Sequence, residues 1–299
     1  MTGRGPLVSF VMPARSPRAD WLRVAVGSVL AQEGCRLELV VVDDGSPEPV
    51  EALLDGMGDA RLRVLRTEHG GASAARNAGL AAIRGDLVRF VDADDAFAAG
   101  STARLAALSG GEAIAYGATA MCDADLRTRW VMRSRAAGDV RAACLQARFT
   151  VRQTSLLYPR AVVERAGGWD PELTVCEDWD FVQRAVEHAP VRGERRVATY
   201  YRRWGGSATA DIDAGARGAE VVVDRYFARH PEQRGTGLER RARARLDAVA
   251  ARVWLTHGRP RDGVRLAASA LRADPRSLAD ELAQALAALG SQAAHRLRG

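Results

Sequence analysis

The chain has 299 residues, 47% of them apolar and 27% charged, which is enough to build the core of one large or two small domains. Aromatic residues at 6%, with 29 Gly and 11 Pro, exclude disordered and collagen-like chains. The 43 basic residues are all Arg, and the net charge of +6 gathers near the C-terminus, where residues 225–299 hold 15 Arg against 7 acidic residues. The longest apolar runs, such as residues 37–42, are far shorter than the roughly 20 residues that span a membrane.

The N-terminal residues and the cysteines bear on the cellular compartment. The N-terminal stretch MTGRGPLVSFVMPARSPRAD has no apolar segment followed by a cleavage site, which argues against secretion. The cysteines lack CxxC spacing, which argues against a zinc site or a disulfide framework. We therefore expect a cytoplasmic protein.

Strands and helices alternate in the first third of the chain. Strands are predicted over four apolar runs, at residues 7–12, 37–42, 62–66 and 86–91. Asp20 is predicted to cap the helix before the second strand, and Ser73 is predicted to cap a helix over residues 74–84. Such alternation is typical of a doubly wound α/β sheet, in which ligands bind outside the carboxyl ends of the strands.

Polar clusters follow three of the predicted strands. They are PARS at 13–16, DDGS at 43–46 and DADD at 92–95. Because the carboxyl ends of parallel strands meet at one edge, these clusters predict a binding site there. Asp92 and Asp94 are separated by one residue and suit a hard cation such as Mg²⁺ or Mn²⁺. The alternatives are an Asp-rich turn at 92–95 and, for Asp43 and Asp44, caps of the helix that follows.

The second half of the chain has a mixed pattern that ends in a helical tail. Strands are predicted at residues 113–122, 129–134, 154–158 and 197–202. Short helices are expected near 139–147 and 160–166, and another opens at Glu177. From about residue 215 the chain is predicted to be helical, with a helix–turn–helix over 254–275. These basic helices pack together or join copies of the chain, and their charge reflects solvated faces or an anionic partner.

Six segments, in this order and at this spacing over about residues 7–209, resemble the family 2 glycosyltransferases of the GT-A fold. The segments are SFVMPARS, VVDDGS, EHGGASAARNAGLAAIRGD, FVDADD, GGWDPELTVCEDWDF and YYRRWGGSAT. The resemblance implies an α/β protein with a Rossmann-like, doubly wound mixed sheet and a C-terminal helical extension. It also implies a nucleotide-sugar and metal-binding half at 1–115, an acceptor-binding half with the catalytic base at 116–212, and a helical region at 213–299.

The resemblance also implies roles for single residues. Asp178 matches the catalytic base, Asp94 the main ligand of Mg²⁺ or Mn²⁺, and Asp92 a residue near both ribose and metal. The residues expected beside the nucleotide sugar are Pro13, Ala14, Arg15, Asp44, Gly71, Arg76, Asp92 and Ala93. Of these, Asp44 matches the acid that contacts the base. Candidates for contact with the sugar or the acceptor are Asp95, Trp169, Glu177 and Trp204.

Several of these residues have a purely structural alternative. Arg76 would be the ion-pair partner of a neighbouring acid, and Glu177 an acid favoured by the dipole at a helix N-terminus. Trp169 would be a core anchor rather than a platform for the acceptor. Asp95 would support its neighbours, and Trp204 would be a packed residue. The sequence leaves each pair of alternatives open.

The chain departs from the family pattern at two places. The loop after the first strand is PARS where the family usually has an aromatic residue and Asn, so an Arg plane replaces stacking on the base or that stacking is lost. Trp204 stands where the family often has a metal-binding His, and indole cannot ligate a metal because its N–H only donates. The QxxRW signature of processive synthases is not evident, which favours transfer of a single sugar.

The implied reaction is the metal-dependent, inverting transfer of one sugar from a UDP-, GDP- or dTDP-linked donor to a hydroxyl of a small molecule or glycan. A natural-product or envelope pathway is expected, without nucleic acid as a partner. A dehydrogenase is disfavoured because no GxGxxG follows the first strand, and a sugar-phosphate nucleotidyltransferase because its Gly-rich opening is missing. The remaining alternative is a catalytically degenerate nucleotide-sugar-binding protein or a scaffold that acts through the basic tail.

Overall fold

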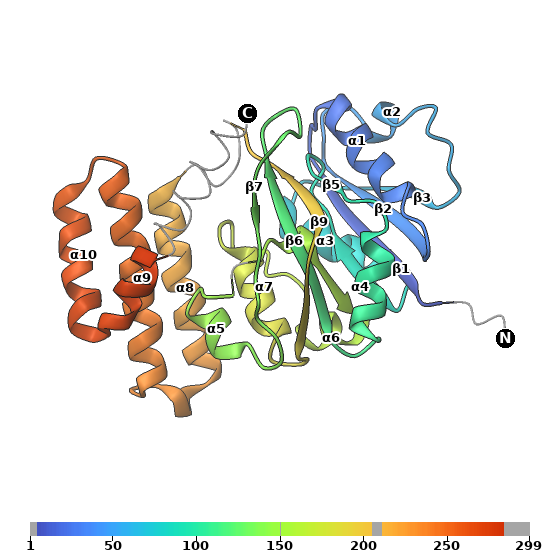
Figure 1. The fold of residues 1–299 in the computed structure, drawn as a ribbon. Coiled ribbons are helices and arrows are strands. Elements are labelled where there is room, and N and C mark those ends of the chain that lie inside the picture. The colour runs from blue at the N-terminus through green and yellow to red at the C-terminus, as the bar shows by residue number, and fades with distance from the viewer. Residues whose placement is uncertain (1–4, 150, 205–210, 284–299) are drawn as a thin grey trace. The chain divides into compact units, whose positions relative to one another are not determined.

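The computed structural model describes residues 5–149, 151–204 and 211–283. Contacts between residues divide the chain into two compact units. Unit 1 comprises Met1–Val140 and Val151–Trp204, and unit 2 comprises Arg141–Thr150 and Gly205–Gly299. Figure 1 shows the sheet of unit 1, and the long helices of unit 2 in orange and red.

Unit 1 is built from strands and helices that largely follow the predicted order. Its strands are β1 (Leu7–Ala14), β2 (Arg36–Asp44), β3 (Leu62–Thr67), β4 (Leu87–Phe90), β5 (Ala96–Phe97), β6 (Ile114–Cys122), β7 (Thr128–Met132), β8 (Leu156–Pro159) and β9 (Val191–Arg202). Its helices are α1 (Ala19–Leu30), α2 (Val50–Leu53), α3 (Gly71–Ala82), α4 (Ser101–Ser109), η1 (Gln153–Ser155), α6 (Arg160–Arg165) and α7 (Glu177–Ala185).

The strands form one mixed sheet of nine in the order β3-β2-β1-β4-β8-β6-β9-β5, with β7 paired to β6. The strands β1 to β4 are parallel to one another, whereas β8 runs antiparallel to both β4 and β6. Since β8 is antiparallel to both, β4 and β6 point the same way. Strand β9 is parallel to β6, so it also points the same way as β1 and β4. The segments that follow β1, β2, β4 and β9 therefore leave the sheet at the same edge.

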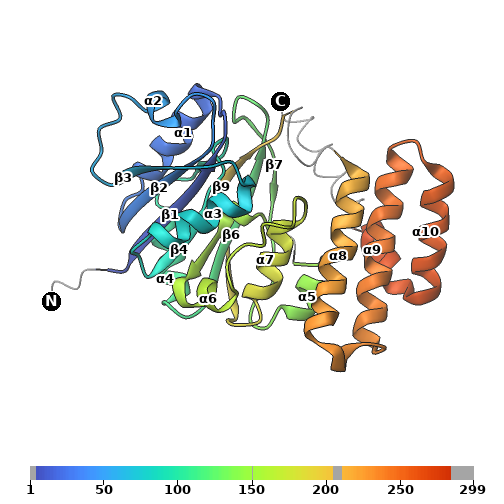
Figure 2. The ribbon, with the colours of Figure 1, turned by 180° about the vertical axis from the view of Figure 1, so that it is seen from behind.

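Helices cover both faces of this sheet, which confirms the predicted α/β fold. Helices α1 and α4 lie on one face, where they contact β2, β5, β6, β8 and β9. Helices α3 and α6 lie on the other face, which Figure 2 shows from the front. Every residue of β2 except Arg36 is buried, as expected for a strand covered on both sides.

The predicted capping residues are wrong for two helices. Helix α1 begins at Ala19, and Asp20 lies within its first turn, where it pairs with the side chain of Arg18 at 2.7 Å. Helix α3 begins at Gly71, two residues before Ser73, and no side chain at its N-cap position accepts a hydrogen bond. Its first backbone N–H groups are instead satisfied by a carboxylate from β2, described below.

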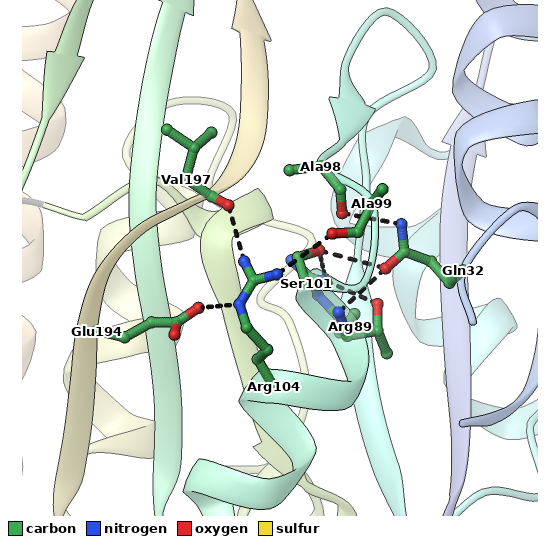
Figure 3. A network of polar contacts seen from close by, with 9 residues as sticks. Gln32, Arg89, Ala98, Ala99, Ser101, Arg104, Glu194 and Val197 are labelled. Carbon is green, nitrogen blue, oxygen red and sulfur yellow. Dashed lines mark hydrogen bonds and ion pairs between the residues drawn. The ribbon is translucent and has the colours of Figure 1, made fainter. Parts of the chain in front are cut away.

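A buried arginine network anchors β4, the strand that leads into residues 92–95. The Arg89 side chain is fully buried and donates to the hydroxyl of Ser101 at 3.2 Å (Figure 3). It also donates to the hydroxyl of Thr102 at 3.0 Å and to the carbonyl of Thr154 at 3.1 Å. Its guanidinium lies 3.8 Å from the ring centroid of Phe97. Burial lowers the pKa of Arg89 to about 9. The network ties β4 to α4 and η1 and so fixes the turn that follows β4.

Gly79 sets the approach of α3 to the sheet. A Cβ at this position would lie 2.4 Å from Cγ1 of Val11, a stiff and fully buried side chain. We expect Gly79→Ala to lower the free energy of unfolding by about 1–3 kcal/mol, although alanine favours helix. Gly27 in α1 has no atom within 4 Å of the corresponding point, so Gly27→Ala should stabilise by up to about 1 kcal/mol. Denaturation of the full chain measures both, and equal stability of the two variants would contradict this packing argument.

Unit 2 consists of helices, as predicted for the C-terminal part of the chain. They are α5 (Arg141–Leu145), α8 (Ile212–Arg229), η3 (Pro231–Gln233), α9 (Gly237–Thr256) and α10 (Pro260–Ala273). Helices α9 and α10 confirm the predicted helix–turn–helix, and a Cβ on Gly263 would lie 2.5 Å from Cγ of Leu255. The buried Arg245 pairs with Glu281 at 2.6 Å. No helix among the described residues is long and apolar enough to cross a membrane.

Candidate functional site

The loops after β1 and β2 are joined at the carboxyl edge of the sheet. The Ser16 backbone N–H donates to the hydroxyl of Ser46 at 2.9 Å. Asp43 accepts from the backbone N–H of Ser46 at 2.9 Å and from that of Val50, the first residue of α2, at 3.1 Å. The capping alternative is therefore correct for Asp43. In the first loop the Arg15 side chain is exposed.

Asp44 is directed to the start of α3 rather than to α2. Its carboxylate accepts from the backbone N–H of Gly70 at 2.7 Å and of Gly71 at 3.1 Å. Nδ1 of His69 lies 2.9 Å from the same carboxylate. Gly71 has a φ of 86°, a conformation that favours glycine. A tertiary contact from β2 thus replaces the local Ser73 cap and holds the 69–71 loop at the site edge.

Arg76 joins three elements of the site. Its side chain is buried, and Nη2 donates to Asp92 at 2.8 Å while Nη1 lies 3.5 Å from the carboxylate of Glu177. The guanidinium also stacks over the ring of Trp169, 4.3 Å from its centroid. The ion-pair alternative is therefore correct for Arg76. One residue of α3 brings the end of β4 and the start of α7 together.

Trp169 is a core anchor. It is 2% exposed, with Arg76 on one side of its ring and the Phe181 ring stacked at 4.5 Å. Its backbone N–H and C=O both bond the side-chain amide of Asn77, at 2.8 and 2.7 Å. Because the ring is buried and packed in this way, it offers no face to an acceptor, and the expected acceptor contact at Trp169 is wrong.

Three carboxylates crowd the turn after β4. Burial and the charge of Asp92 raise the pKa of Asp94. Burial, followed by the charges of Asp92 and Asp94, raises the pKa of Asp95 well above its usual value. Asp95 is 1% exposed and accepts from the Arg202 backbone N–H at 2.9 Å, which favours a supporting role. Burial and mutual repulsion therefore disfavour the ionised forms of Asp94 and Asp95.

Trp204 reaches the same turn from the end of β9. Its Nε1 donates to Oδ2 of Asp94 at 3.0 Å, and its ring meets the edge of Trp21 at 5.2 Å. The side chain is 42% exposed, so it is not a packed core residue. An indole N–H therefore occupies an oxygen of the predicted metal ligand.

The first turn of α7 presents Glu177 and Asp178 beside this cluster. Oδ1 of Asp178 accepts from the backbone N–H of Trp179 at 2.7 Å, and Oδ2 has no hydrogen-bond partner among the described residues. Burial and the charge of Asp178 raise the pKa of Glu177, which Arg76 opposes. Cys176 precedes the helix with a φ of 58°, and burial raises the pKa of its thiol to about 12, so it is not a nucleophile.

The carboxylates of the turn have the ligand chemistry that a divalent cation prefers, but too few of them are grouped to hold one alone. Oxygen ligands suit Mg²⁺ and Mn²⁺. The pKa of Asp94 is raised by burial and then by the charge of Asp92, and a cation would offset this repulsion. However, across residues 5–149, 151–204 and 211–283, no group of three or more His, Cys, Asp or Glu side chains is arranged to hold a metal. Further ligands would have to come from a bound diphosphate and water.

Sequence reasoning missed the residue that ties β9 to the turn. Arg202 donates through Nε to the carbonyl of Asp94 at 2.7 Å and through its terminal nitrogen to the carbonyl of Ala124. Its guanidinium lies 4.4 Å from the ring centroid of Trp21. The only signal was the YYRRW segment, in which the neighbouring Trp204 drew attention. Nothing in the local pattern distinguishes Arg202 from Arg203.

Comparison with known proteins shows the family to which the chain is similar. The family model described as glycosyl transferase family 2 matches residues 9–163, more than half of the chain. The succinoglycan biosynthesis protein ExoO of Rhizobium meliloti is 42% identical over 91 residues, which are 30% of this chain and 26% of that protein. The uncharacterized glycosyltransferase EpsJ of Bacillus subtilis is 36% identical over 92 residues, 30% of this chain and 26% of EpsJ.

Solved structures extend the likeness beyond this segment. S. aureus TarS 1–349 in complex with UDP-GlcNAc has a TM-score of 0.58 at 17% identity, over 93% of this chain and 92% of that one. At this identity the match shows the fold alone. The match to the curated relatives covers about a quarter of their length. From the family model and the fold, the chain belongs to glycosyl transferase family 2.

Proposed function

We propose that the protein transfers one sugar from a nucleoside-diphosphate sugar to a hydroxyl acceptor, with inversion at the anomeric carbon. The TarS structures with UDP and with UDP-GlcNAc support such a donor for a chain of this fold. In this proposal residues 1–115 bind the donor, residues 116–212 bind the acceptor, and residues 213–299 are the helical region. Pro13, Ala14, Arg15 and Ala93 line the donor together with the residues below.

The observation that carries the proposal is the contact of Arg76 with both Asp92 and Glu177. This contact supports the proposal because Glu177 is the neighbour in α7 of Asp178, the residue that matches the catalytic base of the family, so the turn after β4 and the proposed base belong to one site. Asp44 and Gly71 lie at the same edge of the sheet, where the base and ribose of a nucleotide would bind. A donor at β1, β2 and β4 then presents its sugar toward Asp178.

In the proposed reaction, Asp178 accepts the proton of the acceptor hydroxyl. The oxygen attacks the anomeric carbon as the bond to the diphosphate breaks, so the new bond forms on the opposite face. Asp178 suits this role because it lies at the N-terminus of α7, where the helix dipole favours the ionised carboxylate, and because its Oδ2 is available. General-base catalysis contributes about 10²- to 10⁴-fold.

Asp94, with Asp92, would hold the divalent cation. When bound, Mg²⁺ or Mn²⁺ would neutralise the charge that develops on the diphosphate. Asp95 and Arg202 hold the turn in place through the hydrogen bond between them. Because few protein ligands are present, the cation and the nucleotide should bind cooperatively.

Variants of Trp204 test the proposed cation site directly. Replacement by His would exchange an indole donor for a nitrogen ligand next to Asp94, so we expect Trp204→His to tighten Mn²⁺ binding to the nucleotide-free protein. Trp204→Ala should chiefly raise the KM for the acceptor, because the exposed ring is a stacking face. Calorimetric titration of Mn²⁺ measures the first effect. Tight Mn²⁺ binding by the unmodified protein would mean that another residue supplies the missing ligand.

The proposed function is tested by screening UDP, GDP, dTDP and their sugars, with and without Mn²⁺, for a shift in melting temperature. A bound ligand stabilises the folded protein by RT ln(1 + [L]/Kd), so a ligand at about 100 times its Kd adds about 2.7 kcal/mol. Arg76→Met should weaken this stabilisation by the ligand, since it separates Asp92 from Glu177. If no nucleotide binds to the unmodified protein, the scaffold alternative replaces the enzyme.

A further inference from the structure

Arg152 lies in unit 1, one residue before η1 and the strand β8. Its side chain is partly buried, and its Nε is buried without a hydrogen-bond partner. The guanidinium lies 5.0 Å from the ring centroid of Tyr201 on β9. Across the described residues it forms no other hydrogen bond or ion pair through its side chain.

Arg152 differs from Arg89 and Arg76 in that none of its side-chain nitrogens has a hydrogen-bond partner among the described residues, whereas in the other two only Nε is unpaired. Arg89 donates to Ser101 and Thr102, and Arg76 pairs with Asp92. A buried polar atom without a partner is costly, and because the side chain is only partly buried, its terminal nitrogens remain accessible to a ligand. The planar guanidinium matches two oxygens of a carboxylate or phosphate. The chemistry of Arg152 therefore calls for an anionic oxygen group.

The position of Tyr201 places Arg152 at the edge of the carboxylate turn. Ala96 of β5 pairs antiparallel with Tyr200 of β9, so Tyr201 comes opposite Asp95. The hydrogen bond from the Arg202 backbone to Asp95 confirms this alignment. Burial raises the pKa of Tyr201 to about 12, and the acidic side chains of the turn add to this effect while Arg152 opposes it.

The order of strands indicates which substrate this arginine meets. The proposed donor site lies over β1, β2 and β4, whereas η1, β8 and β9 lie on the other side of β4. In an inverting transfer the acceptor attacks from the side opposite to the diphosphate. Arg152, beside β8 and β9, is therefore on the side of β4 away from the proposed donor site, which in this proposal is the acceptor side.

We propose that Arg152, held against Tyr201, binds a carboxylate or phosphate group of the acceptor, so that the enzyme uses an anionic hydroxyl acceptor. The inference rests on the proposed function, because it takes the donor to lie over β1, β2 and β4. Arg152 acts by positioning and selecting the acceptor and takes no part in proton transfer.

The experiment measures binding of inorganic phosphate and of acetate to the full chain by calorimetry, with and without saturating UDP and Mn²⁺. We expect phosphate to bind in the presence of UDP, and Arg152→Met to weaken its binding about 10- to 100-fold. Arg203→Met is the matched control, because Arg203 is an exposed arginine 5.6 Å from the ring centroid of Trp130. Arg152→Lys keeps the charge without the planar group and should weaken phosphate binding less than Arg152→Met does. Melting temperatures verify that each variant folds.

Three outcomes overturn the acceptor assignment. If UDP displaces phosphate from the unmodified protein, the anion that Arg152 binds is the donor diphosphate. If Arg152→Met weakens binding of UDP-glucuronate but not of UDP-glucose, the anion belongs to the transferred sugar. Equal phosphate affinity in Arg152→Met and the unmodified protein removes the anion site altogether. Failure of UDP to bind any variant overturns the proposed function instead, while the phosphate comparison still decides whether Arg152 binds anions.

Discussion

Replacement of Asp178 by Asn is expected to lower kcat by about 10²- to 10⁴-fold, with nucleotide affinity within about twofold of the unmodified protein. The amide keeps the size of the side chain, and its oxygen still accepts from the Trp179 backbone, so the start of α7 keeps its structure. What is lost is the oxygen that receives the acceptor proton. Initial rates at saturating donor and acceptor measure kcat, and calorimetry with UDP measures binding.

Glu177→Gln is the matched comparison for this variant. Glu177 is the neighbouring carboxylate and lies 3.5 Å from Arg76, so its replacement weakens a contact between α3 and α7 without removing the proposed base. We expect Glu177→Gln to reduce kcat less than Asp178→Asn does. A larger loss in Glu177→Gln, with turnover retained in Asp178→Asn, would transfer the role of base to Glu177.

The framework of the site follows from local sequence patterns. Continuous apolar runs mark β1, β2 and β4, and the polar residues directly after each run must leave the sheet at one edge. Hence the position of Asp44 and of the 92–95 turn could be predicted without coordinates. The parallel direction of the strands decides at which edge these residues lie, and the hydrophobic pattern of the sequence indicates where the strands are.

The partners within the site could not be predicted in the same way. Arg76 and Glu177 are 101 residues apart in the chain, and Trp204 and Asp94 are 110 residues apart. No local periodicity fixes which side chains meet over such separations. The predicted cap of α3 was wrong for the same reason. A local cap by Ser73 was expected, whereas the carboxylate of Asp44 on β2 accepts from the backbone N–H at the start of the helix.

The roles of Arg202 and Arg152 could not be predicted because of the composition of the chain. All 43 basic residues are arginine, so the type of residue carries little information about which of them is functional. Arg202 and Arg152 differ from the exposed arginines only by what surrounds them after folding. For Arg202 this is the carbonyl of Asp94, and for Arg152 it is the ring of Tyr201.

Replacement of Asp94 by Asn is expected to weaken Mn²⁺-dependent binding of UDP by about 10²-fold or more and to abolish measurable transfer. The loss should exceed the 10- to 100-fold typical of residues that only support a metal ligand. Asn keeps an oxygen that accepts from the Trp204 indole, so the end of β9 stays in place and the variant tests charge rather than packing. Asp92→Asn should weaken Mn²⁺-dependent UDP binding less than Asp94→Asn does, because Asp92 already has Arg76 as a counter-charge.

Asp86→Asn is the control for Asp94→Asn. Asp86 directly precedes β4 at its amino end and has an exposed side chain, so its replacement makes the same charge change outside the site. Titration of UDP at fixed Mn²⁺, and again with EDTA, separates metal-dependent from metal-independent binding. If the unmodified protein transfers sugar at full rate in EDTA, the carboxylates of the turn hold no cation. Their raised pKa values would then reflect burial and mutual repulsion around Asp95, and Trp204 would be the permanent partner of Asp94.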